Sequence, residues 1–346
     1  MQLFSPYSTK GLTLKNRVVM APMATNLADS AGHPTPALLK HYRERAAGGV
    51  GMVIVEATLV NRPPELPPER LGLWDDECVA PLAALAAAIR EGGAVPAIQL
   101  VDLTLRARVA LPADLPVAQL AGIVADYGRA AGRAAAAGFA AIDIHAAHGT
   151  TLADFLSRRA NRRADSYGGD VAGRARLTLE TLRAVRATVG PDYPLFCRFN
   201  GDEFTVNGNT LQHTVPLAGL LLQAGSDVLD VSAGGRNEDG TYARLRGRPA
   251  AWLPDGCNLY ISAEIKRATG APVIAVGKLG NPEVAEAALA TGACDLVALG
   301  RPLLADPDWA RKAQAGRFST IKRCRCDDRC MELFDDHKPV HCVTYA

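Results

Sequence analysis

Short apolar runs alternate with longer amphipathic segments along the whole chain. Each run is rich in β-branched or aliphatic residues and has the length of a strand buried on both faces. The runs lie at 18–21, 51–55, 95–100, 140–145, 194–198, 228–232, 272–276 and 295–299. Helical patterns lie at 79–91, 116–137, 173–189, 211–223, 261–269, 282–291 and 306–315. Eight strands alternating with helices favour a closed (β/α)8 TIM barrel over a doubly wound sheet.

Proline and glycine positions indicate where several of these helices begin and end. Pro282 follows Asn281 and Pro307 follows Asp306, which is the order of a capping residue and a first helical residue. Glycines stand where a left-handed cap is expected, at Gly138, Gly225, Gly270 and Gly292. No composition break marks a second globular domain, so we expect a barrel over 1–318 and a short tail over 319–346.

Composition and charge exclude several classes of function. The 346 residues are 48% hydrophobic with a formal net charge of +2, so no strong field attracts nucleic acid. No apolar stretch approaches the roughly 18 residues of a membrane span. The first residues lack the basic start and apolar core of a signal peptide, which predicts a cytoplasmic protein.

Four of the eight cysteines lie in the last 23 residues, at Cys324, Cys326, Cys330 and Cys342. Their spacing is C-x-C-x3-C-x11-C, which indicates a ligand set rather than disulfides in a chain without secretory features. Thiolates at this density suit an iron–sulfur cluster or a structural zinc ion. The spacing alone leaves both open.

In a TIM barrel the functional side chains lie at the carboxyl ends of the strands. The fourth run ends in His145 and continues to His148, and neutral imidazoles there can donate hydrogen bonds to a substrate oxygen. A structural histidine pair, or half of a metal site, is the alternative. Arg198 ends the fifth run and needs an anionic partner, either a cofactor atom or a carboxylate.

Three further strand ends carry polar or glycine residues. Gln99 ends the third run and can both donate and accept hydrogen bonds. Gly277 with Lys278, and Gly300 with Arg301, follow the last two runs, where barrels often bind phosphate. The segment 157–170 mixes Asn, Arg, Asp and Gly, which predicts an ordered hydrogen-bonded corner. The segment 236–252 is either a lid or a solvated loop.

Several motifs together resemble the Old Yellow Enzyme family of FMN-dependent barrels. They are LKNRVVMAPM at 14–23, Glu56-Ala57-Thr58, Gln99, HAAHG at 145–149, NRRADSYGG at 161–169 with Arg174 and Arg176, Arg198, and Gly300-Arg301-Pro302. The resemblance covers nearly the whole chain. It is nearest to the iron–sulfur branch, which includes 2,4-dienoyl-CoA reductases and trimethylamine dehydrogenases.

This resemblance implies a role for each site residue. Pro22, Met23 and Ala24 would line the flavin, Ala57 and Gln99 would contact its ring edge, and Arg198 would lie near N1–C2. Gly277, Gly300 and Arg301 would hold the phosphate. His145 and His148 would bind the activating group of a substrate whose β-carbon receives hydride from flavin N5. Cys324, Cys326, Cys330 and Cys342 would bind a [4Fe–4S] cluster, with zinc as the alternative.

The chain departs from the family pattern at three places. Relatives often place tyrosine after His-Gly as the proton donor, whereas this chain has Thr150, a far weaker acid. A His-x-Gly-Arg element usually follows the glutamine, and here the sequence is LVDLTLR at 100–106. The first cysteine gap is one residue shorter than the family's C-x2-C.

The sequence therefore predicts an FMN-dependent oxidoreductase acting on a small organic molecule, either an activated alkene of enone or enoyl type or an amine. Electrons would pass through a [4Fe–4S] cluster to or from a separate electron-transfer partner or NAD(P)H-dependent reductase. Relatives also suggest a homo-oligomer. The alternatives are a redox-neutral flavin isomerase, a desaturase, or a non-catalytic flavin subunit with a zinc-bound tail.

Overall fold

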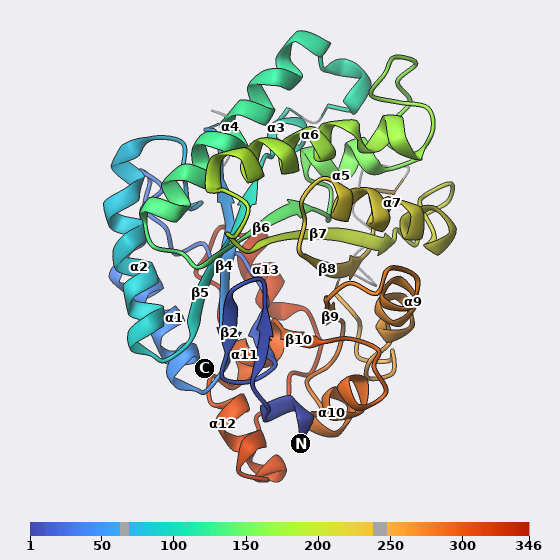
Figure 1. Ribbon diagram of the computed structural model, residues 1–346. Helices are drawn as coiled ribbons and strands as arrows, with labels where there is room; N and C mark the ends of the chain where they lie inside the picture. Colours follow the sequence, from blue (N-terminus) through green and yellow to red (C-terminus); the bar gives the residue numbers. More distant parts are fainter. Residues whose placement is uncertain (63–68, 109, 238–247, 346) are drawn as a thin grey trace.

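Eight parallel strands form a closed barrel in the computed structural model, which describes residues 1–62, 69–108, 110–237 and 248–345. The order around the barrel is β10-β3-β4-β5-β6-β7-β8-β9, so β9 and β10 complete the circle (Figure 1). The strands are β3 (Val18–Met20), β4 (Met52–Leu59), β5 (Val95–Val101), β6 (Ala141–Ala146), β7 (Leu195–Asp202), β8 (Val228–Ala233), β9 (Val273–Val276) and β10 (Leu296–Leu299). The predicted TIM barrel is confirmed.

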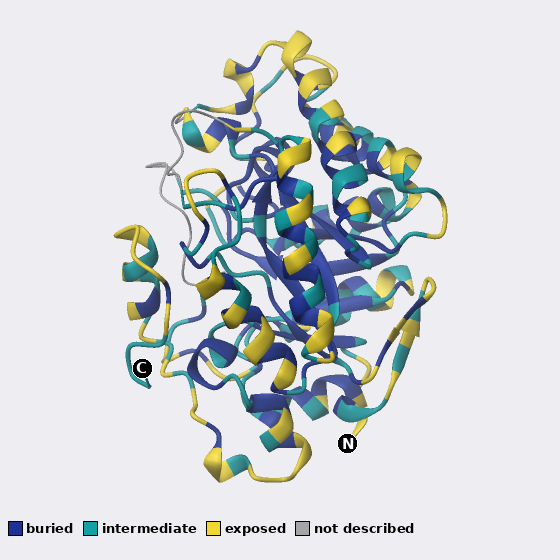
Figure 2. Cartoon of the chain, turned by 90° about the vertical axis from the view of Figure 1, so that its left-hand side faces the viewer, coloured by how far each residue is buried: buried dark blue, intermediate teal, exposed yellow. Residues whose placement is uncertain are grey.

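Helices pack around the barrel with their apolar faces toward the strands. They are α1 (Pro36–Ala47), α2 (Val79–Glu91), α3 (Thr104–Ala107), α4 (Val117–Ala136), α5 (Thr151–Leu156), α6 (Val171–Val189), α7 (Leu211–Gln223), α9 (Leu259–Thr269), α10 (Pro282–Ala290), α11 (Arg301–Ala305), α12 (Trp309–Gln314) and α13 (Arg329–Asp335). Figure 2 shows buried strands at the centre and exposed residues on the outer helix faces. An inner layer of buried strands and an outer layer of half-exposed helices is the normal arrangement of an α/β barrel.

The interior of the barrel is a packed layer of side chains. Residues from alternate positions on the strands, among them Val19, Met52, Phe196 and Ile274, form one buried cluster. Leu12 and Leu14 of the short hairpin β1 (Tyr7–Thr9) and β2 (Leu12–Leu14) join this cluster. The hairpin therefore closes one end of the barrel, a feature that the strand pattern did not predict.

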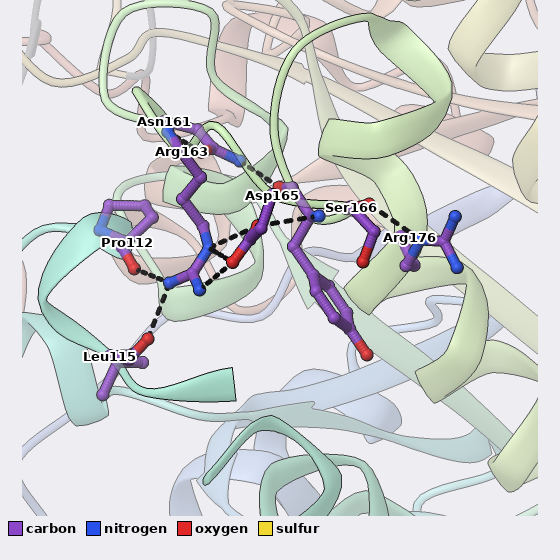
Figure 3. A network of polar contacts seen from close by, with 8 residues as sticks. Pro112, Leu115, Asn161, Arg163, Asp165, Ser166 and Arg176 are labelled. Atoms are coloured by element: carbon purple, nitrogen blue, oxygen red, sulfur yellow. Dashed lines mark hydrogen bonds and ion pairs between the residues drawn. The ribbon is translucent and has the colours of Figure 1, made fainter. Parts of the chain in front are cut away.

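The Asn- and Arg-rich segment is the ordered corner that its composition predicts. Arg163 forms an ion pair with Asp165 and also donates to the carbonyls of Pro112 and Leu115 (Figure 3). Asn161 donates to two more carbonyls, those of Phe155 and Tyr167 at 2.7 Å each. Arg163 and Asn161 thus satisfy backbone carbonyls of neighbouring segments, which gives both residues a structural role.

The tail packs against the loop that follows β3. The Asn26 side chain donates to the carbonyls of Phe334 at 3.0 Å and Lys338 at 3.2 Å, and the Val340 N–H donates to the Thr25 carbonyl at 2.8 Å. Arg70 lies over the Phe334 ring, with its guanidinium carbon 4.2 Å from the ring centroid. A few polar contacts thus place α13 beside the barrel.

Most helix boundaries agree with the sequence pattern, and one is wrong. Asn281 caps α10 by accepting from the Glu283 N–H, and all four predicted cap glycines have positive φ. The helix expected at 306–315 begins instead at Trp309, because the Asp306 backbone is extended and the Asp306 carboxylate accepts from the Asp308 N–H before the helix starts. Helices α1 and α5 were not predicted. Positions 238–247 of the expected lid segment lie outside the described residues.

No helix within the described residues combines the length and the apolar character that crossing a bilayer requires. The eight cysteines, all of which the structure describes, form no disulfide bond.

Candidate active site at the barrel mouth

A cavity of about 540 Å³ opens at the carboxyl ends of the strands. This volume lies in the range of sites for small molecules and cofactors. Its lining includes every predicted flavin and substrate residue, together with two of the four tail cysteines. These lining residues are Pro22, Met23, Ala24, Ala57, Gln99, His145, His148, Arg198, Gly277, Gly300, Arg301, Cys324 and Cys326. The barrel therefore brings together residues that lie far apart in the sequence.

His145 and His148 meet edge to face at the end of β6, with ring centroids 5.2 Å apart. His148 has a positive φ of 61°, which turns the chain sharply after the strand. Its Nε2 lies 2.7 Å from the Ser232 hydroxyl on β8. Burial is the main cause that lowers the pKa of both imidazoles well below 6.5, and Arg198 lowers them further. Both rings are therefore neutral near pH 7 and suited to hydrogen bonding.

Arg198 on β7 pairs with one fully buried acid, Asp230, and acts electrostatically on a second, Asp143. It is the register partner of His145 on one side and of Asp230 on the other, and its Nη1 lies 3.5 Å from Asp230 Oδ2. Gln99 donates to Asp143 at 2.7 Å from the neighbouring strand. Burial raises the pKa of both carboxyls; Asp230 raises that of Asp143 further, whereas Arg198 opposes the rise. Gln99 and Arg198 thus connect the cavity to a buried polar network behind it.

Close packing requires the glycines that follow β9 and β10 on the other side of the mouth. Gly277 has a φ of 133°, and a Cβ there would lie 2.7 Å from Asn258 Nδ2. A Cβ on Gly300 would lie 2.7 Å from Met23 Sδ. Arg301 lines the same region, but its guanidinium donates to Asp328 at 2.9 Å and to the Pro249 carbonyl at 2.8 Å. Arg301 therefore also connects the tail and the 249 loop to the barrel.

Thr150 occupies the place where many relatives have a tyrosine. Its hydroxyl donates to the His145 carbonyl at 3.0 Å and accepts from the Ala153 N–H at 3.2 Å, which caps α5. The hydroxyl hydrogen is used by the backbone. Thr150 has a structural role in addition to being a weak acid.

The four tail cysteines lie in two pairs. Cys324 and Cys326 line the cavity and are connected by a 3.4 Å hydrogen bond from the Cys326 N–H to Cys324 Sγ. Cys330 and Cys342 pack instead with Leu304 and Val340 in a small apolar cluster. Among the residues that the structure describes, no three metal-ligating side chains form a metal site. A zinc ion and a [4Fe–4S] cluster both need the four sulfurs around one centre, so this arrangement is preformed for neither.

The barrel residues fit a flavin better than the tail fits a metal. Within the described residues, His145 Nδ1 and Arg198 Nε are buried nitrogens without a hydrogen-bond partner, and both residues line the cavity. Buried polar atoms without partners are costly unless a ligand satisfies them. A phosphate can bind to the backbone of glycine loops, and a buried guanidinium stabilises a reduced flavin ring. The apolar Met23 suits the face of that ring.

Sequence reasoning missed the two acids behind the site and the serine beside it. Asp143 and Asp230 each interrupt an apolar strand run, which was an available signal of a buried polar network. Ser232 also ends a strand, but serine is too common at strand ends to be singled out. Its contact with His148 depends on barrel closure.

A family model described as the NADH:flavin oxidoreductase / NADH oxidase family matches residues 2–119 and 112–319. An NADH oxidase of Thermoanaerobacter brockii is 36% identical over 95% of this chain and 53% of its own length. An NADPH dehydrogenase of Geobacillus thermodenitrificans is also 36% identical, over 89% of this chain and 92% of its own length. The chain thus spans about half the length of some curated relatives and nearly all of others.

Solved structures share the fold. A 2-naphthoyl-CoA reductase complex superposes with a TM-score of 0.91 and 24% identity, covering 99% of this chain and 56% of that one. The family match and the two relatives confirm the resemblance drawn from the motifs. The chain belongs to the NADH:flavin oxidoreductase / NADH oxidase family and is of the Old Yellow Enzyme type.

Proposed function

We propose that the chain exchanges hydride equivalents between FMN and a small organic substrate held over the histidine pair. Bound FMN would supply the hydride chemistry at its N5. One observation carries the proposal: two neutral imidazoles and a buried guanidinium line one cavity at the barrel mouth, and within the described residues His145 Nδ1 and Arg198 Nε are buried without a hydrogen-bond partner. The site supplies hydrogen bonds to a polarised oxygen and a positive charge for a developing negative one.

Each lining residue has a proposed task. Pro22, Met23 and Ala24 would lie against the flavin, and Ala57 and Gln99 would contact its edge. Arg198 would stabilise negative charge near N1–C2, supported from behind by Asp230. Gly277, Gly300 and Arg301 would hold the phosphate, although Arg301 shares its guanidinium with Asp328.

His145 and His148 would donate hydrogen bonds to the carbonyl of an activated alkene or to an equivalent group. Ser232 would orient His148 through its 2.7 Å contact. Because the Thr150 hydroxyl caps α5, a proton for the α-carbon would come from water at the open mouth. An amine substrate, from which hydride departs, requires no such donor and is the other substrate class.

The tail, residues 319–346, would form a second unit that binds a [4Fe–4S] cluster through Cys324, Cys326, Cys330 and Cys342. Their spacing and the position of two of them in the flavin cavity support this proposal. A cluster would supply one-electron transfer. Because the two pairs lie apart, assembly would require the tail to rearrange. NAD(P)H or a separate reductase would supply electrons, and the unpaired cysteines suit a reducing compartment such as the cytoplasm.

The test begins with an absorption spectrum of anaerobically purified protein and an assay of iron, zinc and acid-labile sulfide. We expect FMN bands, and a broad shoulder near 400 nm with about four irons per chain if the cluster is present. Anaerobic NADPH should bleach the flavin, and a cyclic enone should restore its colour. Protein that retains no FMN would contradict the proposal. Flavin that neither alkenes nor amines reoxidise or reduce would leave the isomerase, the desaturase and the non-catalytic subunit as the alternatives.

A further inference from the structure

The walls of the cavity carry many more basic than acidic side chains. The basic residues are Arg70, Arg106, Arg198, Arg248, Lys278, Arg301 and Arg323, whereas Asp255 and Asp335 are the acidic ones among the described lining residues. A cleft lined by one sign of charge concentrates ligands of the opposite sign. The phosphate of FMN accounts for part of this excess, on the side where it would bind.

Arg106 lies on the opposite side of the mouth from the proposed phosphate site. It belongs to α3, which follows β5, and β5 is four strands from β9 in either direction around the barrel. Gly277 follows β9 and Gly300 follows the neighbouring β10. The charge of Arg106 is therefore placed for a ligand other than the phosphate.

Buried contacts hold the short helix that carries Arg106. The two oxygens of fully buried Asp102 accept from the Thr104 N–H and the Thr104 hydroxyl, each at 3.0 Å. The Leu105 N–H donates to the Thr151 hydroxyl at 3.2 Å, which connects α3 to α5. Arg106 itself is exposed, so its guanidinium projects from a rigid base into the open mouth. The backbone that carries Arg106 is therefore preorganised, so binding would restrict mainly the arginine side chain.

The field of Arg106 reaches the histidine pair. Burial is the largest cause of the lowered pKa of His145 and of His148, and Arg198 and Arg106 both add to it. A positive field that disfavours an imidazolium ion favours an anion at the same point. The point at which a substrate would meet the histidines therefore lies in a positive field to which Arg198, Arg106 and, at His148, Arg248 contribute.

We propose that Arg106 binds a carboxylate of the substrate, so that the site selects small organic anions over neutral molecules of the same shape. A guanidinium pairs with a carboxylate through two parallel hydrogen bonds, which suits this task better than a lysine would. The proposal rests on the proposed function, because it places the rest of the substrate against His145 and His148. It also assigns a use to the altered 100–106 segment.

The test compares 4-hydroxybenzoate with 4-hydroxybenzamide, which have the same shape and differ in charge. Calorimetry on the FMN-loaded chain should give at least tenfold tighter binding of the benzoate, and added salt should reduce this preference. Arg106→Gln should weaken benzoate binding at least tenfold and leave the amide within about twofold. Arg108→Gln is the matched control, because Arg108 is the C-cap residue of the same short helix and is not among the residues that line the cavity.

Two readouts separate this inference from the proposed function. A shift of the flavin absorption band reports whether the ligand lies against the cofactor. A band shift with equal affinity for the two ligands, or equal losses in Arg106→Gln and Arg108→Gln, would overturn the inference and leave the flavin site intact. A carboxylate preference that depends on Arg106 without a band shift would support anion binding but contradict the proposed substrate position.

Discussion

The cavity is built from two regions that are held in place in different ways. The strand ends supply His145 and Arg198, whose positions follow from the register of a closed parallel barrel. The tail supplies Cys324 and Cys326 from a segment attached by a few side-chain and backbone hydrogen bonds. Three residues of the tail, Cys326, Asp328 and His337, have positive φ. The barrel presents a preformed site, whereas the tail depends on local turns.

The two regions differ in whether ligand binding would contribute to their folding. In the barrel, Gln99 donates to Asp143 and Arg198 pairs with Asp230, while His145 Nδ1 and Arg198 Nε are among the buried atoms without a hydrogen-bond partner within the described residues. In the tail, the cysteines are divided between the cavity and the Leu304 cluster. A bound metal group would have to bring them together, and its binding energy would then contribute to the folding of the tail.

Replacement of a single tail cysteine should have the largest effect, and it tests directly whether the four cysteines bind one metal group. Cys330→Ser should abolish metal binding, because a cluster needs all four thiolates, while FMN content stays unchanged. Cys294→Ser is the matched control, since Cys294 is buried in the barrel and distant from the tail cluster. Iron, sulfide and flavin assays on both variants measure the result. Undiminished iron in Cys330→Ser would exclude the proposed ligand set.

Two phenylalanines compare the stability of the two regions. Phe199 on β7 is fully buried in the main core, and Phe199→Ala should destabilise the protein by about 3–5 kcal/mol. Phe334 on α13 is only partly buried and packs against Arg70, so Phe334→Ala should cost roughly 1 kcal/mol. Urea unfolding followed by far-UV circular dichroism gives both values. Equal losses would show that the tail belongs to the cooperative core.

The same division explains which features could be predicted from the sequence. Strand runs such as 228–232 are easily recognised in the sequence because parallel strands are apolar on both faces. Barrel closure then places the residues at the strand ends around one mouth. Helix α5 was missed because Thr151–Leu156 is short and buried all round, without the periodicity of an amphipathic helix. The hydrogen bond from Thr150 to the His145 carbonyl is likewise a local backbone detail that no side-chain pattern reveals.

The relation between the cysteines could not be predicted at all. Their spacing indicates a shared ligand, but the positions of Cys324 and Cys330 relative to each other depend on left-handed residues at Cys326 and Asp328. Such turns are not specified by residue type when glycine is absent. Residue identity predicted the chemistry of the tail, and backbone geometry decides its arrangement.

Glu56 lies at the junction between the two regions and gives a smaller, pH-dependent effect. It is buried on β4, where the Tyr42 hydroxyl donates to it at 3.3 Å, and Arg70 connects it electrostatically to the tail. Burial raises its pKa from 4.5 to about 7. The folded state therefore keeps a proton that the unfolded state loses above 4.5, so this contribution to stability is complete at low pH and disappears as pH rises through 7.

Glu56→Gln should remove that dependence. Relative to the variant, the wild-type protein should lose roughly 1–3 kcal/mol of stability between pH 5 and pH 8. Urea midpoints at both pH values measure the difference. Glu44→Gln on the neighbouring, exposed part of α1 should show no such change. A Glu56→Gln variant that tracks the wild type at both pH values would mean that Glu56 is ionised in the folded protein.

Removal of one imidazole from the barrel mouth should give the smallest effect, which is a loss of ligand affinity. His148→Ala should weaken phenol binding roughly tenfold, about 1.4 kcal/mol, because one hydrogen bond to the ligand oxygen is lost. Ser232→Ala removes only the group that orients His148, so its loss should be smaller. His341→Ala, which changes the same side chain in the tail, should leave the affinity unchanged. Titration of the flavin absorption band measures all three.

Because burial and Arg198 lower the pKa of His148 well below 6.5, the effect of His148→Ala should be the same at pH 6.5 and pH 8. An effect that fades as pH rises between these values would mean that the ring binds as an imidazolium ion, and that the barrel mouth adapts to its ligand as the tail must.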